Sequence, residues 1–146
     1  MKQRYIKSAE LKQAEKEIFE WKKLQHPRVP EGALIYPKLR DDKTNELTKA
    51  VQQYTRAKGF FIERISSTGR MLNGKWIKGT GTNGTADLSA IINGRPIKIE
   101  IKCAATKDRQ SEAQKRYQEK VEKAGAVYII VRSFEEYYNW LSGFVR

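Results

Sequence analysis

The chain contains one cysteine and one histidine among 146 residues, and it has no long hydrophobic run. One cysteine excludes an intramolecular disulfide framework, and without a second cysteine or a histidine cluster no thiolate or imidazole metal site can form. The longest apolar run, residues 126–131, is far shorter than the ~18 residues that span a bilayer. Residues 1–5 lack the apolar stretch of a signal peptide. We therefore expect a cytosolic protein with no membrane partner.

Acidic residues are also scarce. The sequence has 29 Lys and Arg against 17 Asp and Glu, a formal charge of +12. Between residues 49 and 78 the only acid is Glu63, among seven bases. A positive potential attracts polyanions, of which nucleic acid is the commonest, whereas charge alone is also compatible with a basic surface kept for solubility. The one-sided patch favours a nucleic-acid partner.

Three of the four prolines follow the first helical pattern. Apolar residues at helical spacing predict a helix over about residues 8–24, and Pro27, Pro30 and Pro37 then predict an extended connector. We treat 1–42 as an N-terminal helical arm and 43–146 as one domain. The pattern leaves open whether the arm packs on its own domain, binds a second copy or lies along nucleic acid.

The rest of the chain alternates helical and strand patterns. Helices are predicted over about 44–58 and 111–124, with a last one from about 134, and a continuously apolar strand over 127–131. Strands are also predicted over 60–65 and on both sides of residues 93–94. This order predicts an α/β fold in which helices flank a small mixed sheet.

Glycines are concentrated in residues 66–85, a long loop or hairpin that also carries bases. Such a segment suits a grip on a phosphate backbone; the alternative is an ordinary hairpin around Asn73-Gly74 whose Trp76 packs on the core. Residues 79–84 match G-x-G-x-x-G, but these glycines precede a strand instead of leading from a strand into a helix. We therefore expect no nucleotide cofactor.

Asn93-Gly94, between two alternating apolar runs, is a strong signal for a two-residue hairpin turn. Such a turn pairs residues whose numbers add up to 187. Apolar residues then share one face of the hairpin, and polar residues share the other. The predicted pairs are Leu88–Ile99, Ala90–Ile97, Ser89–Lys98, Ala86–Ile101 and Asp87–Glu100.

Two carboxylates directly opposite each other, Asp87 and Glu100, repel unless a cation lies between them. Oxygen ligands without Cys or His favour a hard ion, Mg²⁺ or Mn²⁺. Lys102 alternates onto the same face, where a cation can orient a water or stabilise charge on a phosphate. The alternative is an exposed strand face with scattered charges. The in-register acids and the turn together favour a metal site.

These residues resemble the core of the PD-(D/E)XK nucleases, with Asp87 followed by Glu100-Ile101-Lys102 after a hairpin. More specifically, the chain resembles the VRR-NUC (virus-type replication-repair nuclease) domain over about residues 45–141. Ala86 stands where that pattern usually has proline. The matching features are Glu46 in a helix, the basic stretch 70–78, G-x-x-D-L at 84–88, I-E-x-K at 99–102 and S-x-x-Q at 111–114.

The resemblance implies a restriction-endonuclease-like fold and Mg²⁺ held by Asp87, Glu100, the Ile101 carbonyl and Glu46. It makes Lys102 the residue that positions the attacking water, which displaces the 3′ oxygen. It also places Gln114 near the metal water or the phosphate. From the residues alone, Glu46 complements a helix dipole and Gln114 completes a capping box with Ser111.

The expected activity is a metal-dependent DNA endonuclease, and the resemblance implies a homodimer acting on branched or Holliday-junction DNA in the cytoplasm of a bacterial or phage-infected cell. Its alternatives are a restriction-type or flap-trimming nuclease on the same core and a non-catalytic DNA-binding subunit. The dimer interface is expected on the arm (Leu11, Ile18, Trp21) or on the last helix (Trp140, Phe144). The candidate DNA-binding bases are Arg64, Arg70, Lys75, Lys78, Lys98 and Arg116.

Overall fold

The computed structural model describes residues 2–65, 70–77 and 82–146. Within them no helix is long and apolar enough to cross a membrane. The helices are α1 (Ala9–Gln25), α2 (Thr44–Ala57), α3 (Glu112–Lys123) and α4 (Phe134–Phe144), with 3₁₀ turns η1 (Glu31–Ala33) and η2 (Ala104–Thr106). The strands are β1 (Phe61–Arg64), β2 (Arg70–Leu72), β3 (Lys75–Ile77), β4 (Leu88–Ile92), β5 (Arg95–Ile101) and β6 (Val127–Val131).

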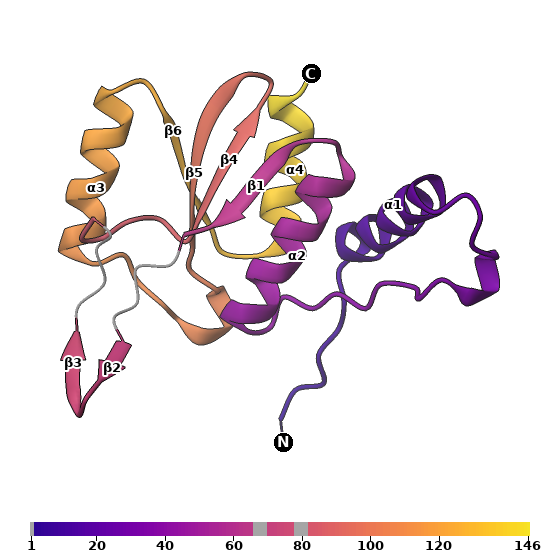
Figure 1. Ribbon diagram of the computed structural model, residues 1–146, viewed down its shortest axis with the longest axis horizontal. Coiled ribbons are helices and arrows are strands. Elements are labelled where there is room, and N and C mark those ends of the chain that lie inside the picture. Colours follow the sequence, from indigo (N-terminus) through magenta and orange to yellow (C-terminus); the bar gives the residue numbers. More distant parts are fainter. Residues whose placement is uncertain (1, 66–69, 78–81) are drawn as a thin grey trace.

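Four strands form a mixed sheet in the order β1-β4-β5-β6. The first two pairings are antiparallel, and β5 runs parallel to β6 through the α3 crossover. In Figure 1, α3 lies on one side of this sheet and α2 and α4 lie on the other. The predicted α/β fold, a small mixed sheet flanked by helices, is confirmed. The apolar β6 is an edge strand, although α3 and α4 cover its two faces.

The β4–β5 hairpin has the predicted turn and register. Asn93 and Gly94 both have positive φ, 51° and 74°, as a two-residue turn requires. The ladder pairs Leu88 with Ile99 and ends there, so the predicted ladder pairs Asp87–Glu100 and Ala86–Ile101 do not form. Asp87 is a bend residue just before β4. It reaches β5 through its side chain instead.

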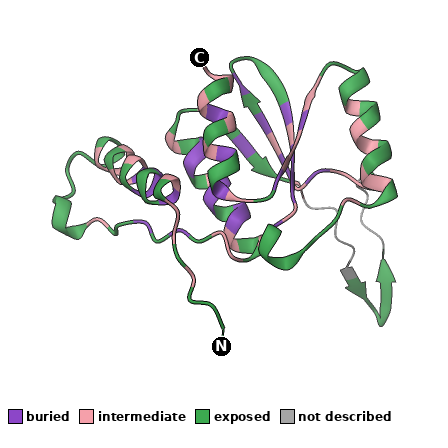
Figure 2. Ribbon diagram, turned by 180° about the vertical axis from the view of Figure 1, so that it is seen from behind, coloured by how far each residue is buried: buried purple, intermediate pink, exposed green. Residues whose placement is uncertain are grey.

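The two faces of the sheet differ in polarity. Alternate residues of β4 and β5 are buried against α2 and α4, with Leu88, Ile97 and Ile99 at the centre of the core. The opposite face carries Lys98 and Glu100 toward α3. Figure 2 shows burial concentrated between the sheet and the α2–α4 layer, whereas α3 is largely exposed along its outer side. The fold therefore holds its polar residues on the α3 side of the sheet.

The N-terminal arm packs on its own domain. Helix α1 contacts α2 and α4, and its Leu11 and Ile18 belong to the same buried cluster as the sheet. The buried Glu15 accepts hydrogen bonds from Lys7 (2.7 Å) and from the backbone N–H of Leu39 (2.8 Å). Leu11 and Ile18 are thus unavailable as the dimer interface proposed for them. Of that set, only Trp21 remains partly exposed.

Strands β2 and β3 form a separate hairpin, turned by Asn73 and Gly74 with φ of 51° and 76°. The hairpin around Asn73-Gly74 thus forms, but Trp76 is 63% exposed and does not pack on the core as the alternative of an ordinary hairpin had it. The predicted grip of this segment on a phosphate backbone lies partly outside the described residues. Lys78, Gly79, Gly81 and the side chain of Arg70 are among those that the structure does not describe.

Candidate functional site

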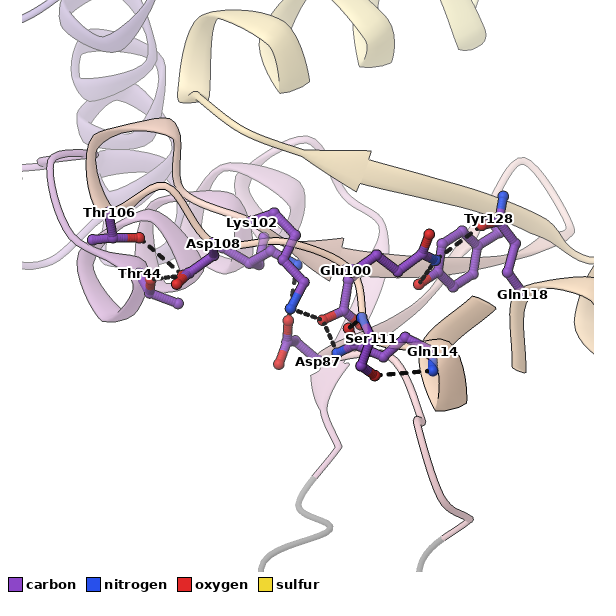
Figure 3. A network of polar contacts seen from close by, with 12 residues as sticks. Thr44, Asp87, Glu100, Lys102, Thr106, Asp108, Ser111, Gln114, Gln118 and Tyr128 are labelled. Carbon is purple, nitrogen blue, oxygen red and sulfur yellow. Dashed lines mark hydrogen bonds and ion pairs between the residues drawn. The ribbon is translucent and has the colours of Figure 1, made fainter. Parts of the chain in front are cut away.

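Glu100 is the centre of the polar face. It is 1% exposed, although it is a carboxylate on a strand that also carries Arg95 and Lys98. Its Oε1 accepts a hydrogen bond from Nε2 of Gln114 at 2.7 Å and lies 3.5 Å from Nζ of Lys102. Figure 3 shows these three side chains converging with Asp87 between β5 and the start of α3. The structure thus brings four of the predicted site residues together.

The second carboxylate oxygen of Glu100 is left without a hydrogen bond. Oε2 is buried, and no residue within 2–65, 70–77 and 82–146 donates to it. Burial, and then the negative charge of the neighbouring Asp87, raises the pKa of Glu100 to about 8, while Lys102 opposes the shift. An unpaired buried oxygen beside a second acid is costly unless a proton or a cation occupies the space.

Asp87 is fixed at the end of the sheet by backbone groups on both sides. Its Oδ2 accepts from the N–H of Ile101 at 2.8 Å, and its carbonyl accepts from the N–H of Ile65 at 2.8 Å. The first bond explains why the ladder stops before Asp87. The N–H of Ile101 donates to the Asp87 side chain, whereas in a longer ladder it would donate to a backbone carbonyl of the segment before β4. Ile101 thus contacts Asp87 through its N–H, and its carbonyl remains the predicted metal ligand.

Gln114 caps α3, as the sequence predicted, and also contacts the buried acid Glu100. Its Oε1 accepts from the N–H of Ser111 at 2.8 Å, and Oγ of Ser111 accepts from the N–H of Gln114, which completes the capping box of α3. Because the amide oxygen is used in the cap, the amide nitrogen points to Glu100. The helix start therefore orients a hydrogen-bond donor onto the buried acid.

Glu46 does not join the acids. Its side chain lies 3.5 Å from Lys49 on its own helix, in a partly exposed ion pair. Across residues 2–65, 70–77 and 82–146, no three acids, histidines or cysteines form a group suited to a metal ion. The structure supplies two neighbouring carboxylates, Asp87 and Glu100, and the predicted third ligand lies outside the pair.

Sequence reasoning missed two residues near the site. Asp108, in the loop after β5, accepts hydrogen bonds from the hydroxyls of Thr44 (3.0 Å) and Thr106 (2.9 Å), so it ties that loop to the start of α2. Tyr128 on β6 packs against Tyr117 and accepts from Gln110 at 3.2 Å. Spacing alone carries no signal for either, because both contacts depend on how the loops cross the sheet.

The four candidate DNA-binding bases whose side chains the structure describes lie on four different elements. Lys98 donates to Ser89 at 2.9 Å on the polar face, Arg64 lies 3.4 Å from Asn45, and Lys75 is exposed on the β2–β3 hairpin. Arg116 lies elsewhere, on α3, where a hollow of about 320 Å³ opens beside it. The residues that line this hollow are Thr82, Asn83, Ala113, Arg116, Tyr117 and Lys120.

Comparison with known proteins gave no match to a protein-family model, a curated protein or a solved structure. The site is therefore interpreted from its own geometry and from the motif resemblance.

Proposed function

We propose that this protein is a Mg²⁺-dependent DNA endonuclease with a PD-(D/E)XK core of the VRR-NUC type. The observation that carries the proposal is the buried Oε2 of Glu100 beside Asp87, to which none of the described residues donates a hydrogen bond. Retaining two acids in such a place costs stability, whereas a nuclease needs them to hold a cation at a phosphate. The motif order described above supports the same assignment.

The two carboxylates fit a hard divalent cation, because they offer oxygen donors and their mutual repulsion is relieved by positive charge. Asp87 and Glu100 would hold it, with Mn²⁺ expected to replace Mg²⁺. When bound, the ion supplies Lewis-acid stabilisation of the phosphate and lowers the pKa of water. The Ile101 carbonyl is a further proposed ligand, whereas Glu46 pairs with Lys49 on its own helix.

The neighbouring side chains have distinct roles in the proposed reaction. Gln114 donates to Oε1 of Glu100, which leaves Oε2 as the carboxylate oxygen available to a cation. Lys102, with its Nζ 3.5 Å from Glu100, places a positive charge where an attacking water can be oriented and where negative charge develops on phosphorus. The Ile101 N–H fixes the carboxylate of Asp87.

A nucleic-acid substrate accords with the charge distribution. No acidic residue occurs between Glu63 and Asp87, a stretch that contains four bases. Arg116 and Lys120 line the hollow beside α3, and Ala113, which also lines it, directly precedes Gln114 of the site. Preference for branched DNA, including four-way junctions, follows from the VRR-NUC resemblance.

The direct test uses the purified chain with Mg²⁺ on linear, nicked, flap and four-way-junction DNA. Asp87→Asn and Glu100→Gln should abolish cleavage but preserve or strengthen DNA binding, because each removes a metal ligand and a charge that repels phosphate. Glu63→Gln, which removes an exposed acid from β1, is the matched control and should cut normally. Near wild-type cleavage by either site variant would contradict the assignment. Binding without cleavage by the wild type would favour the non-catalytic alternative.

We further propose a homodimer, since one chain contains one set of acids and symmetric cutting of two strands needs two. With Leu11 and Ile18 buried in their own chain, the expected interface is at α4. There Trp140 lines a hollow of about 190 Å³ next to the edge strand β6. Sedimentation as a monomer at micromolar concentration, with and without junction DNA, would contradict the dimer and favour a single-strand nickase.

A further inference from the structure

The β2–β3 hairpin presents apolar side chains to solvent in an unusual concentration. Met71 is 62% exposed and Trp76 is 63% exposed, and Leu72 and Ile77 are also exposed. Figure 1 shows the hairpin projecting from the body of the protein, below the sheet and α3. A monomeric surface rarely keeps such side chains together without a partner for them.

The register divides these side chains between the two faces of the hairpin. Met71 is paired with Trp76, so the two lie on one face. Leu72 is paired with Lys75, and both lie on the other face. One face thus offers an aromatic ring and a thioether side by side, and the other combines an aliphatic side chain with a cation.

The hairpin is also connected to the sheet beside the proposed active site. It is inserted between β1 and β4, which are neighbours in the sheet. At the end of β1, the N–H of Ile65 donates to the carbonyl of Asp87, which immediately precedes β4. The chain therefore leaves the sheet for the hairpin next to one of the two acids, and it returns through the segment that leads into that acid.

Charge indicates which partner suits the hairpin. Residues 64–86 contain four bases and no acid, so the segment attracts a polyanion and repels a second copy of itself. Nucleic acid provides both negative charge and flat apolar bases, and proteins that bend or open DNA place apolar side chains against unstacked bases.

We propose that the Met71–Trp76 face stacks on an unpaired or unstacked base at the branch point of the DNA, and so selects branched over continuous duplex substrate. This inference rests on the proposed nuclease function and names its substrate-selecting surface. Trp76 supplies the stacking ring, and Met71 packs beside it. Lys75, on the opposite face, contributes to general attraction to phosphate.

The test is the affinity of the full chain for a four-way junction and for a duplex of the same length, measured in EDTA so that no DNA is cut. Trp76→Ala should weaken junction binding about 5- to 150-fold, the range expected for one lost base–aromatic stack, and leave duplex binding nearly unchanged. Trp76→Phe should keep most of the preference, whereas Trp76→Leu, apolar but unable to stack in the same way, should not.

Leu24→Ala, which shortens an equally conspicuous exposed side chain on α1, is the matched control and should leave the preference intact. An unchanged junction-to-duplex ratio in Trp76→Ala, in a protein that binds and cuts DNA, would overturn this inference alone. Loss of self-association in Trp76→Ala without a change in that ratio would also overturn it, and would assign the hairpin to a protein interface. Failure of the wild type to bind any DNA would contradict the proposed function itself.

Discussion

Gly84 lies directly against the backbone of Ala113, in the first turn of α3. A Cβ on Gly84 would come within 2.3 Å of the carbonyl carbon and oxygen of Ala113, and the φ of Gly84 is +73°. The same chain segment leads to Asp87, and the same helical turn carries Gln114. The contact therefore holds the segment that carries Asp87 against the helical turn that carries Gln114.

Gly84→Ala should disrupt the site and destabilise the fold. The left-handed φ costs about 1–2 kcal/mol for a residue with a Cβ, and forcing an extra carbon into a packed contact costs about 1–3 kcal/mol more. We expect the free energy of unfolding to fall by about 2–5 kcal/mol, with loss of cleavage. Urea denaturation and the endonuclease assay measure the two effects.

Gly94→Ala is the control for backbone conformation. Gly94 has nearly the same φ, +74°, but nothing lies within 4 Å of the position its Cβ would take. In Gly94→Ala the free energy of unfolding should fall only by the cost of the left-handed φ, about 1–2 kcal/mol, and the variant should keep its activity. Equal losses in the two variants would mean that the contact with Ala113 does not position the site.

The turn at Asn93-Gly94 made the β4–β5 register predictable, because two residues of positive φ leave few alternatives. The same arithmetic failed at Asp87, since a repeating pattern does not reveal where a ladder ends. There the carboxylate of Asp87 takes the N–H of Ile101. The predicted proximity of Asp87 and Glu100 is nevertheless correct. The side chain of Asp87 still contacts β5, although its backbone is no longer paired with that strand.

Other features depend on tertiary contacts that no local pattern encodes. The apolar stripe of α1 predicted a buried face but not the surface that covers it, which is formed by α2 and α4. Spacing suggested a cap or a site residue for Gln114, and only the arrangement of α3 over β5 shows that its two amide atoms serve both. The exposure of Trp76 likewise follows from the hairpin's projection away from the core.

The metal-free protein should lose stability as the pH rises, through Glu100. Its pKa is raised from 4.5 to about 8 in the folded state, in an environment set by Asp87, Lys102 and Gln114. The folded chain therefore holds this proton more tightly than the unfolded chain. The resulting contribution is complete below about pH 4.5 and is lost as the pH rises through about 8.

In EDTA, Glu100→Gln should match the wild type near pH 4 and exceed its free energy of unfolding near pH 9 by on the order of a few kcal/mol. Mg²⁺ at the higher pH should stabilise the wild type and not the variant. Urea denaturation across this pH range is the measurement. Glu112→Gln, an exposed acid in the first turn of α3, is the control and should follow the wild type. Parallel dependences of the free energy of unfolding on pH in wild type and Glu100→Gln would show that Glu100 does not hold its proton more tightly in the folded chain.

Arg116 and Lys120 should contribute to DNA affinity as phosphate contacts, because they line the hollow beside α3. Replacing both with Ala should flatten the dependence of log K on log salt by about 1.8 for duplex DNA, at about 0.9 per phosphate contact. Binding should weaken alike for all sequences. Replacing Lys12 and Lys16 of α1, which are exposed on the arm, removes the same charge and should leave the slope nearly unchanged. Equal slopes for both double variants would place the footprint elsewhere.

Asp41 should be the most sensitive residue of the connector, because it fastens the arm to α4. Its Oδ1 accepts from the hydroxyl of Tyr5 at 2.7 Å, and its Oδ2 accepts from the N–H of Phe134, the first residue of α4, at 3.1 Å. Asp41→Ala leaves both donors without this partner and should lower the free energy of unfolding by about 1–3 kcal/mol in urea denaturation. Asp42→Ala is the matched control, since Asp42 pairs with Arg40 in a partly exposed ion pair, and it should change stability little. Similar stabilities for the two variants would mean that the connector is held by its apolar residues and not by Asp41, because the charge removed is the same in both.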